Sequence, residues 1–223
     1  MSLHLYRDIE ALCKRLLQIG AMVERSVTEA TTAFLQRDAE RARGVVRGDR
    51  EVDVAEVRLE EDCLKVLALH QPVAGDLRFV VAVLKVNNDL ERMADAAESI
   101  AARALQLCAL PPFQIPVELS QMVTMASGMT RKALECLQRE DAKLAREILE
   151  DDIAVDAAQR RMFEVLQERM RGQPGDVDAA VLTLSTSRQI ERIADLATNV
   201  AEDVVFLEEG EIVRHKRSQL RLL

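Results

Sequence analysis

The chain has 223 residues, a net charge of −8 at pH 7 and a sequence pI near 5.1. Such an acidic chain is a poor candidate for a sequence-independent nucleic-acid-binding protein, which needs a basic surface. Apolar residues make up 48% of the sequence but aromatic residues only 3%, and tryptophan is absent. Glycine and proline cluster in a few short stretches, so the composition predicts long helices and an all-α fold.

The expected helices follow one another with short connections. Apolar residues spaced by three and four predict a first helix over residues 5–36, and Asp38 is suited to cap a second helix that ends near His70. Asp76 should open a third helix, which reaches about residue 107. The stretch Leu110–Pro116 contains three prolines and cannot be helical, so we interpret it as a linker. Three further helices are expected over residues 117–139, 141–171 and 176–207.

Short connections between long helices make neighbouring helices antiparallel, so each half should be an up-down three-helix bundle. We therefore expect two tandem bundles over residues 1–109 and 117–212, joined by the linker 110–116 and followed by a basic tail, residues 213–223. This tail suits either free solvation or docking on a partner or membrane surface. Its basic residues are Arg214, His215, Lys216, Arg217 and Arg221.

The second half repeats motifs of the first half. The matched pairs are Glu91-Arg92-Met93-Ala94-Asp95 with Glu191-Arg192-Ile193-Ala194-Asp195, Gln71-Pro72…Gly75-Asp76 with Gln173-Pro174-Gly175-Asp176, and Asp49…Asp53 with Asp152…Asp156. Self-similarity with a period of about 100 residues indicates a duplicated ancestral unit. The residues kept in both copies are largely acidic, which core packing does not require. We therefore look for function among these acids.

The acids gather on one flank of two helices in each half. Because each residue advances an α-helix by about 100°, Glu91 and Asp95 lie about 40° apart and roughly 120° from the apolar stripe. The preceding helix has Asp49 and Asp53 on a comparable line. If the two helices are neighbours, four carboxylates converge on one solvent-facing surface, and the second half repeats the arrangement.

Such a surface allows two interpretations. Like charges four residues apart destabilise a helix by roughly 0.2–0.5 kcal/mol per pair, and a hard, oxygen-seeking cation would reverse that repulsion. Alternatively, Arg92 and Arg192 lie three residues from Asp95 and Asp195 and could neutralise the acids without a metal, leaving a plain solvated face. The sequence leaves both interpretations open.

Other site signatures are missing from the sequence. It has no glycine-rich phosphate loop, and its three histidines are isolated from one another. The cysteines have no CxxC spacing and lie within apolar helical patterns, which predicts small buried side chains in a reducing compartment: Cys13, Cys63, Cys108 and Cys136. No apolar run approaches the ~18 residues of a membrane span, and no signal-peptide pattern opens the chain, so we expect a soluble cytoplasmic protein.

The two Glu-Arg-x-Ala-Asp motifs, each preceded by a Gln-Pro…Gly-Asp helix start and an Asp-x-x-x-Asp pair, resemble the PhoU family from about Leu5 to His215. The resemblance implies two three-helix bundles with pseudo-twofold symmetry and multinuclear metal sites (Fe, Zn, Mn or Mg) on their surfaces. It also implies a negative regulator of the phosphate-starvation response. Such a regulator couples the phosphate ABC transporter ATPase to a phosphate sensor histidine kinase and meets the membrane only through these partners. The implied metal ligands are Asp49, Asp53, Glu91 and Asp95 in the first half and Asp152, Asp156, Glu191 and Asp195 in the second.

The chain departs from the family pattern in two respects. Ala94 and Ala194 stand where glycine is common, which should change the approach of the backbone slightly. The second half has Gln159 and Thr198 where the first has Glu56 and Glu98, with Glu202 as partial compensation, so the two sites should differ in metal number or affinity.

Three functions remain in competition at this point. The acids suit a regulatory adaptor, a metal-dependent phosphoesterase, or a helical scaffold with a solvated acidic face. The lack of a phosphate-binding loop and of a nucleophile–base pair favours the adaptor over the enzyme. We expect the adaptor to be a homodimer, as suits an elongated helical protein.

Overall fold

The structure, a computed structural model, describes residues 3–210, and every regular element among them is a helix, which confirms the all-α prediction. The basic residues 214–221 of the expected tail lie outside this range. The helices are α1 (Leu3–Gln36), α2 (Ala39–His70), α3 (Ala74–Cys108), α4 (Val117–Arg139), α5 (Ala142–Gly172) and α6 (Val177–Glu209), with a short 3-10 helix η1 (Pro174–Asp176) before α6.

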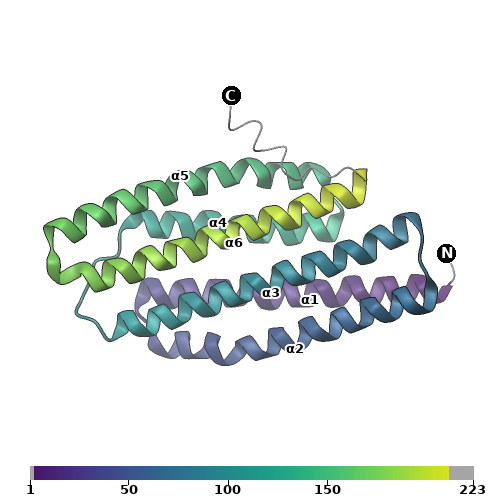
Figure 1. Cartoon of the computed structure of the whole chain (residues 1–223), viewed down its shortest axis with the longest axis horizontal. Coiled ribbons are helices and arrows are strands. Elements are labelled where there is room, and N and C mark those ends of the chain that lie inside the picture. Colours follow the sequence, from purple (N-terminus) through teal and green to yellow (C-terminus); the bar gives the residue numbers. More distant parts are fainter. Residues whose placement is uncertain (1–2, 211–223) are drawn as a thin grey trace.

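The helices form two tandem three-helix bundles, α1–α3 and α4–α6, as expected (Figure 1). Helices α3 and α6 lie antiparallel to each other in the middle of the molecule and make most of the contact between the bundles. Helices α1 and α4 lie behind them in the view of Figure 1 and make a smaller contact. The front face therefore consists of α5, α6, α3 and α2, in that order across the molecule.

Aspartates cap two of the helices, and the sequence predicted the first of these caps. Asp38 precedes α2 and its carboxylate accepts a hydrogen bond from the backbone N–H of Arg41 at 3.0 Å. Asp141 precedes α5 and accepts two such bonds, from Lys143 and Leu144. These carboxylates satisfy backbone donors that have no partner within the helix.

The starts of the third and sixth helices differ from the prediction. Helix α3 begins at Ala74, two residues before Asp76, and no side chain caps it. Asp176 ends the short 3-10 helix instead of capping α6, and its carboxylate accepts a hydrogen bond from Arg169 Nε at 2.7 Å. Asp76 and Asp176 therefore lie near the starts of these helices, as predicted, but neither side chain caps its helix.

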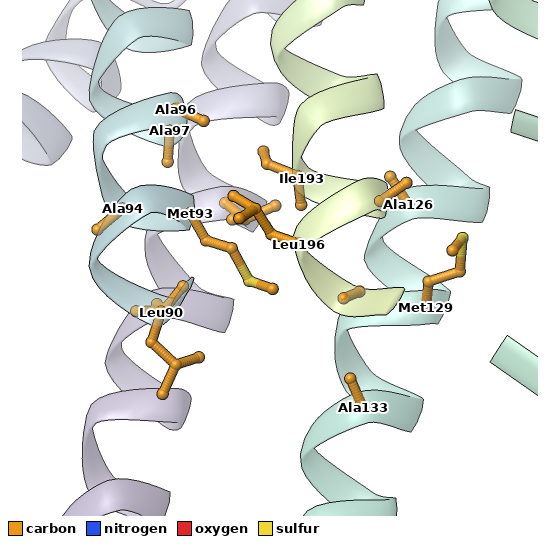
Figure 2. Close-up of a cluster of buried hydrophobic side chains, with 14 of the residues drawn as sticks. Leu90, Met93, Ala94, Ala96, Ala97, Ala126, Met129, Ala133, Ile193 and Leu196 are labelled. Carbon is orange, nitrogen blue, oxygen red and sulfur yellow. The ribbon is translucent and has the colours of Figure 1, made fainter. Parts of the chain in front are cut away.

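The core is built from the predicted apolar stripes. Met93 and Ala94, the apolar residues of the repeated motif in α3, are buried, so this part of the motif belongs to the packing of the bundle. Figure 2 shows Met93 of α3 and Leu196 of α6 pointing toward each other across the contact between the bundles. The core is thus continuous through both repeats, and it holds the acid-bearing faces of α3 and α6 in fixed positions.

The cysteine prediction is only partly right. Cys63 and Cys136 are buried, and burial, reinforced by neighbouring carboxylates, raises the pKa of their thiols to about 11 and about 12. Cys13 and Cys108 are half-buried, so the expectation of four buried thiols is wrong for these two. They lie at the edges of their apolar stripes, where sequence periodicity does not decide burial.

Polar contacts between α3 and α6 repeat across the pseudo-twofold axis. Lys85 forms an ion pair with the buried Asp203 at 3.2 Å and lies over the ring of Phe206 at 5.0 Å. At the equivalent place on the other side, Arg103 Nε donates to the Ser185 hydroxyl at 2.6 Å. Positions 85 and 185 correspond in the duplication, as do 103 and 203, so the duplication has produced a pseudo-symmetric interface with different chemistry on its two sides.

The linker between the repeats is held by two arginines. The Arg37 guanidinium donates to the carbonyl oxygens of Leu107, Leu110 and Pro111 at 2.6, 2.6 and 3.0 Å. Arg169 donates to the Gln114 carbonyl at 2.8 Å and lies 4.3 Å from the centroid of the Phe113 ring. The non-helical linker is therefore fixed against both bundles.

Candidate functional site: two carboxylate patches on one face

The acids of the first repeat lie on the adjacent helices α2 and α3. We call them the first carboxylate patch: Asp49, Asp53, Glu56 and Glu60 on α2, and Glu91, Asp95 and Glu98 on α3. Asp49 shows that the two helices bring their acids together. Its pKa is raised to about 6, first by burial and then by the charges of Asp53, Glu98 and Asp95. Two of these three charges come from α3, so the predicted convergence of the two helices is confirmed.

Glu91 gives the same result from the α3 side of the patch, while Glu56 is crowded by acids of its own helix. The pKa of Glu91 is raised first by burial, then by Asp95 on its own helix and by Glu56, Asp53 and Asp49 on α2. The pKa of Glu56 is raised by burial and then by Glu60 and Asp53. Each of these three carboxylates therefore resists ionisation, because it is partly withdrawn from water and surrounded by like charge.

Asn87 lies beneath the first patch and was not singled out from the sequence. Its side chain is 1% exposed, and Nδ2 donates to both the backbone carbonyl and Oε1 of Glu56, each at 3.1 Å. The other amide atom, Oδ1, is buried and has no hydrogen-bond partner among residues 3–210. Asn87 fixes the position of Glu56, and the signal that could have found it is a polar residue inside an otherwise apolar stripe of α3.

The second repeat has the corresponding arrangement on α5 and α6. We call it the second carboxylate patch: Asp152 and Asp156 on α5, and Glu191, Asp195 and Glu202 on α6. The pKa of Glu191 is raised first by burial and then by Asp195, Asp156 and Asp152, while Arg188 acts in the opposite direction. The two helices again bring their acids together, as the duplication predicts.

The second patch differs from the prediction at Asp152. The sequence placed all the repeated acids on a solvent-facing flank, but the Asp152 side chain is only 3% exposed. The expectation holds for Asp195 and for Asp53 and Asp95 of the first patch, which are exposed. Asp152 is one of the buried residues of α5, and a helical wheel does not show how deeply the edge of the acidic line is covered by the neighbouring helix.

Two uncharged residues of the second repeat stand where the first repeat has glutamates. Thr198 is buried, and its hydroxyl donates to the backbone carbonyl of Asp195 at 2.7 Å. Gln159 stands at the position of Glu56, and its Oε1 is buried without a hydrogen-bond partner in the described part of the chain. The second patch is therefore poorer in charge than the first.

The arginine of the motif takes a specific partner. Arg92 Nη1 lies 3.3 Å from Oδ1 of the buried Asp89, one turn earlier on α3. Asn199 of α6 also donates to this oxygen, at 3.4 Å. Arg92 thus contributes to the contact between α3 and α6. The pKa of Glu91 is raised by burial and by carboxylates, and no arginine charge offsets this rise.

Helix geometry puts both patches on one face of the molecule. On α3, Glu91 and Asp95 lie roughly 80–120° around the helix from Lys85 and Arg103, which face α6, and on the opposite side from the stripe that packs on α1. The same relation holds on α6 for Glu191. Because α1 and α4 lie behind α3 and α6 in Figure 1, this helix geometry assigns both patches to the side of the molecule formed by α5, α6, α3 and α2.

The carboxylates share a face without being drawn together into a closed site. Over residues 3–210, no three His, Cys, Asp or Glu side chains stand at the mutual spacing of metal ligands. The donor set consists of carboxylate oxygens, and it includes all eight of the ligands implied by the family resemblance. Its chemistry matches hard cations, which take oxygen ligands and tolerate variable geometry.

Comparison with known proteins agrees with the duplicated architecture. The PhoU domain family model matches the chain twice, over residues 16–104 and 119–204. The chain is 34% identical to the phosphate-specific transport system accessory protein PhoU homolog of Aquifex aeolicus, over 95% of this chain and 96% of the relative. It is 33% identical to the homolog of the same name from Burkholderia sp, over 93% and 90% of the two chains.

Solved structures show the same fold. The crystal structure of PhoU from Pseudomonas aeruginosa superposes with a TM-score of 0.89 at 32% identity, covering 92% of this chain and 99% of the other. The phosphate transport system regulatory protein PhoU from Streptococcus pneumoniae gives a TM-score of 0.86 at 27% identity, covering 94% and 99%. With both repeats matched in sequence and in fold, the chain belongs to the PhoU family.

Proposed function

We propose that this protein is a regulatory adaptor of phosphate uptake. In this proposal it restrains the phosphate-starvation response by coupling the state of the phosphate ABC transporter to a phosphate sensor histidine kinase, acts in the cytoplasm and forms a homodimer. The supporting observation is family membership over both repeats, with relatives named as accessory proteins of the phosphate-specific transport system.

We further propose that both carboxylate patches bind metal ions. Asp49, Glu91 and Glu191 all have raised pKa values, because carboxylates from two helices crowd together at partly buried positions. A cation bound between the helices would remove this repulsion and supply the countercharge that the side chains lack. The oxygen-only donor set fits Fe, Mn, Zn or Mg, and the ligands would be the aspartates and glutamates at positions 49, 53, 91 and 95 and at 152, 156, 191 and 195.

Hydrogen bonds from neighbouring residues would keep both patches ordered around a cation. Asn87 holds Glu56 through two hydrogen bonds, and Thr198 binds the backbone of Asp195. Asp53 and Asp95 have exposed side chains, so they can move toward an ion at little cost.

The shared face gives the adaptor a plausible working surface. Both patches lie on the α5–α6–α3–α2 side, so a partner that contacts this side would meet both at once. Metal binding would change the charge of this face from strongly negative toward neutral. In this mechanism the metal is structural and electrostatic, and the protein performs no reaction.

The adaptor proposal is tested by affinity capture. The full-length protein is immobilised and exposed to the phosphate transporter, with its ATPase subunit, and to the sensor kinase, at high and at low phosphate. We expect capture of both at high phosphate. Capture of neither partner under either condition would refute the adaptor function.

The metal proposal needs a separate measurement. Metal content is determined on protein purified without chelator, and melting curves are recorded for stripped protein with and without added Mn, Fe, Zn or Mg. We expect bound metal and a higher melting temperature, and loss of both in the Asp53→Asn/Asp95→Asn and Asp156→Asn/Asp195→Asn double variants. The matched control is Asp151→Asn, because Asp151 forms an ion pair with Lys132 at 2.7 Å outside the patches. If none of the four metals changes the melting curve of the stripped protein, metal binding is refuted. Phosphoester hydrolysis that is lost in the patch variants would refute the non-enzymatic mechanism.

A further inference from the structure

The outward face of α2 has a stripe of apolar side chains that the bundle leaves uncovered. Helix α2 forms one edge of the molecule, and no other helix of residues 3–210 lies beyond it (Figure 1). Val54, Val57 and Leu64 are exposed by 42%, 50% and 54%, although α2 also has a buried face that packs in its own bundle. Ala68 extends the stripe and is exposed too. We call Val54, Val57, Glu61, Leu64 and Ala68 the α2 seam.

The α2 seam has the residue spacing of a coiled coil. Its members follow one another in steps of three and four residues, which are the a and d positions of a heptad repeat. Positions a are Val54, Glu61 and Ala68, and positions d are Val57 and Leu64. The f positions, which face solvent in an isolated coiled coil, are buried in the bundle here: Val52, Leu59 and Val66. Helix α2 therefore packs in its own bundle through one face and presents a coiled-coil face on the opposite side.

The second repeat shows that the bundle does not need this apolar face. With the offset that relates the two Asp-x-x-x-Asp pairs, Val57 and Leu64 correspond to Arg160 and Gln167 of α5. Helix α5 has the same place in the second bundle as α2 has in the first. Exposed apolar side chains at a place where the fold does not require them mark a contact surface.

The two flanks of the α2 seam have opposite charges. On the side toward α3, the heptad g positions are Asp53 and Glu60, which belong to the first carboxylate patch. On the side toward α1, the e positions are Arg58 and Lys65, which line the groove between α1 and α2. The acid in this groove beside the e positions, Asp62, is already paired: with Arg15 of α1 and, at 3.2 Å, with Lys65. Arg47 and Glu51, one turn earlier on this side, offset each other.

A second copy of this chain fits these charges when the two α2 helices run parallel. A twofold axis along the seam then places the acidic flank of each copy against the basic flank of the other. Asp53 meets Arg58 of the second copy, and Glu60 meets Lys65, which is the pairing of g with the following e position in parallel coiled coils. Antiparallel helices would place acid against acid and base against base. The face is therefore complementary to itself in one orientation.

Glu61 is the member of the seam that opposes this packing. In parallel register its carboxylate lies near its own counterpart and near Glu60 of the second copy. Because it is exposed, the side chain can turn toward Arg58 or Lys65, three and four residues away on its own helix. One polar residue at position a weakens a coiled coil but fixes its register. With a seam only about 21 Å long, this charge should make the dimer reversible.

We propose that the α2 seam is the interface between two copies of this chain, which pack α2 against α2 in parallel about a twofold axis. The inference rests on the homodimer of the proposed function and assigns the surface of that homodimer. The twofold axis turns the patch-bearing faces of the two copies to opposite sides of the dimer, so each face stays open to a partner.

Sedimentation equilibrium of the full chain, treated with chelator and measured over a range of concentrations, tests the interface. We expect a dimer that dissociates on dilution. Arg58→Glu/Lys65→Glu turns the attractive pairs into repulsive ones without touching the carboxylate patch, and should weaken the dimer at least tenfold. Glu61→Leu replaces the charged layer by an apolar one and should strengthen the dimer at least tenfold. The matched control is Arg160→Glu/Arg161→Glu, which makes the same change of charge on α5 and should leave the dimer unchanged.

A cysteine at position d tests the orientation. In parallel register, Val57→Cys faces its counterpart and should form a disulfide-linked dimer on oxidation, whereas antiparallel packing about the middle of the seam would hold the two residues about 12 Å apart along the helices. Ile153→Cys, at an exposed apolar position of α5, should not cross-link, and the parent with Cys13 and Cys108 gives the background.

The outcomes separate the seam from the homodimer itself. A dimer that Arg58→Glu/Lys65→Glu and Glu61→Leu leave unchanged would overturn the seam and let the homodimer stand. A monomer at every concentration would overturn both, and a dimeric Val57→Cys that fails to cross-link would overturn the parallel packing. All variants should keep the helicity of the parent, so that a loss of dimer reports on the interface.

Discussion

Asp49 offers the sharpest test of the charge crowding in the first patch. Its pKa is raised from an ordinary 3.8 to about 6, so between these values the folded protein holds a proton that the unfolded chain has lost. Stability should therefore fall as the pH rises from about 4 to about 6, and the whole penalty is present above pH 6. Replacing Asp49 by Asn removes the penalty at neutral pH and changes little in acid.

The size of the effect follows from the pKa. A change from 3.8 to about 6 corresponds to roughly 3 kcal/mol if none of it is screened. Because Asp49 is only partly buried, water and salt screen the charges, and we expect about 1 kcal/mol. For a chain of this length, that is a rise in melting temperature of about 2–4 °C in metal-free Asp49→Asn at about pH 8.

The assay is thermal and urea unfolding of chelator-treated protein at about pH 8 and about pH 4. The control is Asp151→Asn, which removes the ion pair with Lys132 and should be neutral or slightly destabilising at about pH 8. Added metal should reverse the sign for Asp49→Asn, since the variant lacks a ligand that the parent uses. Destabilisation of the metal-free variant by the same amount at both pH values would show that Asp49 is held by structural contacts, and the reasoning would be wrong.

Three further predictions concern the interfaces and helix ends. Lys85→Met should destabilise the protein by about 3 kcal/mol in urea unfolding, because it removes the ion pair of the buried Asp203. The double variant Lys85→Met/Asp203→Leu should recover most of this loss, and a cost of the single variant below about 0.5 kcal/mol would contradict the prediction. Arg37→Ala removes three hydrogen bonds to the end of α3 and the linker and should cost about 2 kcal/mol in the same assay, whereas an unchanged midpoint would mean that the linker is held by packing alone. Asp141→Ala should cost about 1 kcal/mol through loss of the α5 cap, and Asp141→Ser should restore it; equal loss in both variants would contradict a capping role.

Much of the fold could be predicted because local signals and global packing agree. The spacing of apolar residues, the aspartate caps and the proline-rich linker each point to the same six helices. The start of α3 escaped prediction because Ala74 enters the helix from a left-handed backbone conformation, with φ at 50°, and no capping side chain announces it. The half-burial of Cys13 and Cys108 also escaped prediction, since burial at the edge of a stripe depends on which neighbouring helix lies beside it.

The carboxylate patches were predictable for a different reason. The duplication allows the two halves of the chain to be compared with each other. Acids that occur at the same positions of both halves are not explained by core packing. The roles of Asn87 and Asp152 could not be read in this way. The position of Asn87 corresponds to Ser187 in the second repeat, so it is not a repeated feature, and the burial of Asp152 depends on the exact rotation of α5 against α6.

Ala94 and Ala194 illustrate how a departure from a family motif can be absorbed. Both are buried, at 2% and 0% exposure, and Ala94 points away from α6 in Figure 2. The Ala94 methyl group therefore enters the core of its own bundle, on the side of α3 away from α6. The substitution adds apolar contact in the core and leaves the neighbouring Asp95 and Asp195 exposed.

The two patches are related by duplication but are electrostatically unequal, and this inequality has a consequence for metal binding. The first patch has more carboxylates and a partly buried Asp49 whose pKa is near 6, so protons compete with metal there at mildly acidic pH. The second patch has the buried Asp152 and the uncharged Gln159, and Arg188 partly offsets the charge around Glu191. If both patches bind metal, occupancy of the first should therefore fall more steeply with acidity than occupancy of the second. The variant Asp53→Asn/Asp95→Asn leaves only the second patch intact, and Asp156→Asn/Asp195→Asn leaves only the first. Metal titrations of both variants at two pH values compare the patches, and an equal change of affinity with pH would show that the difference in charge has no effect on binding.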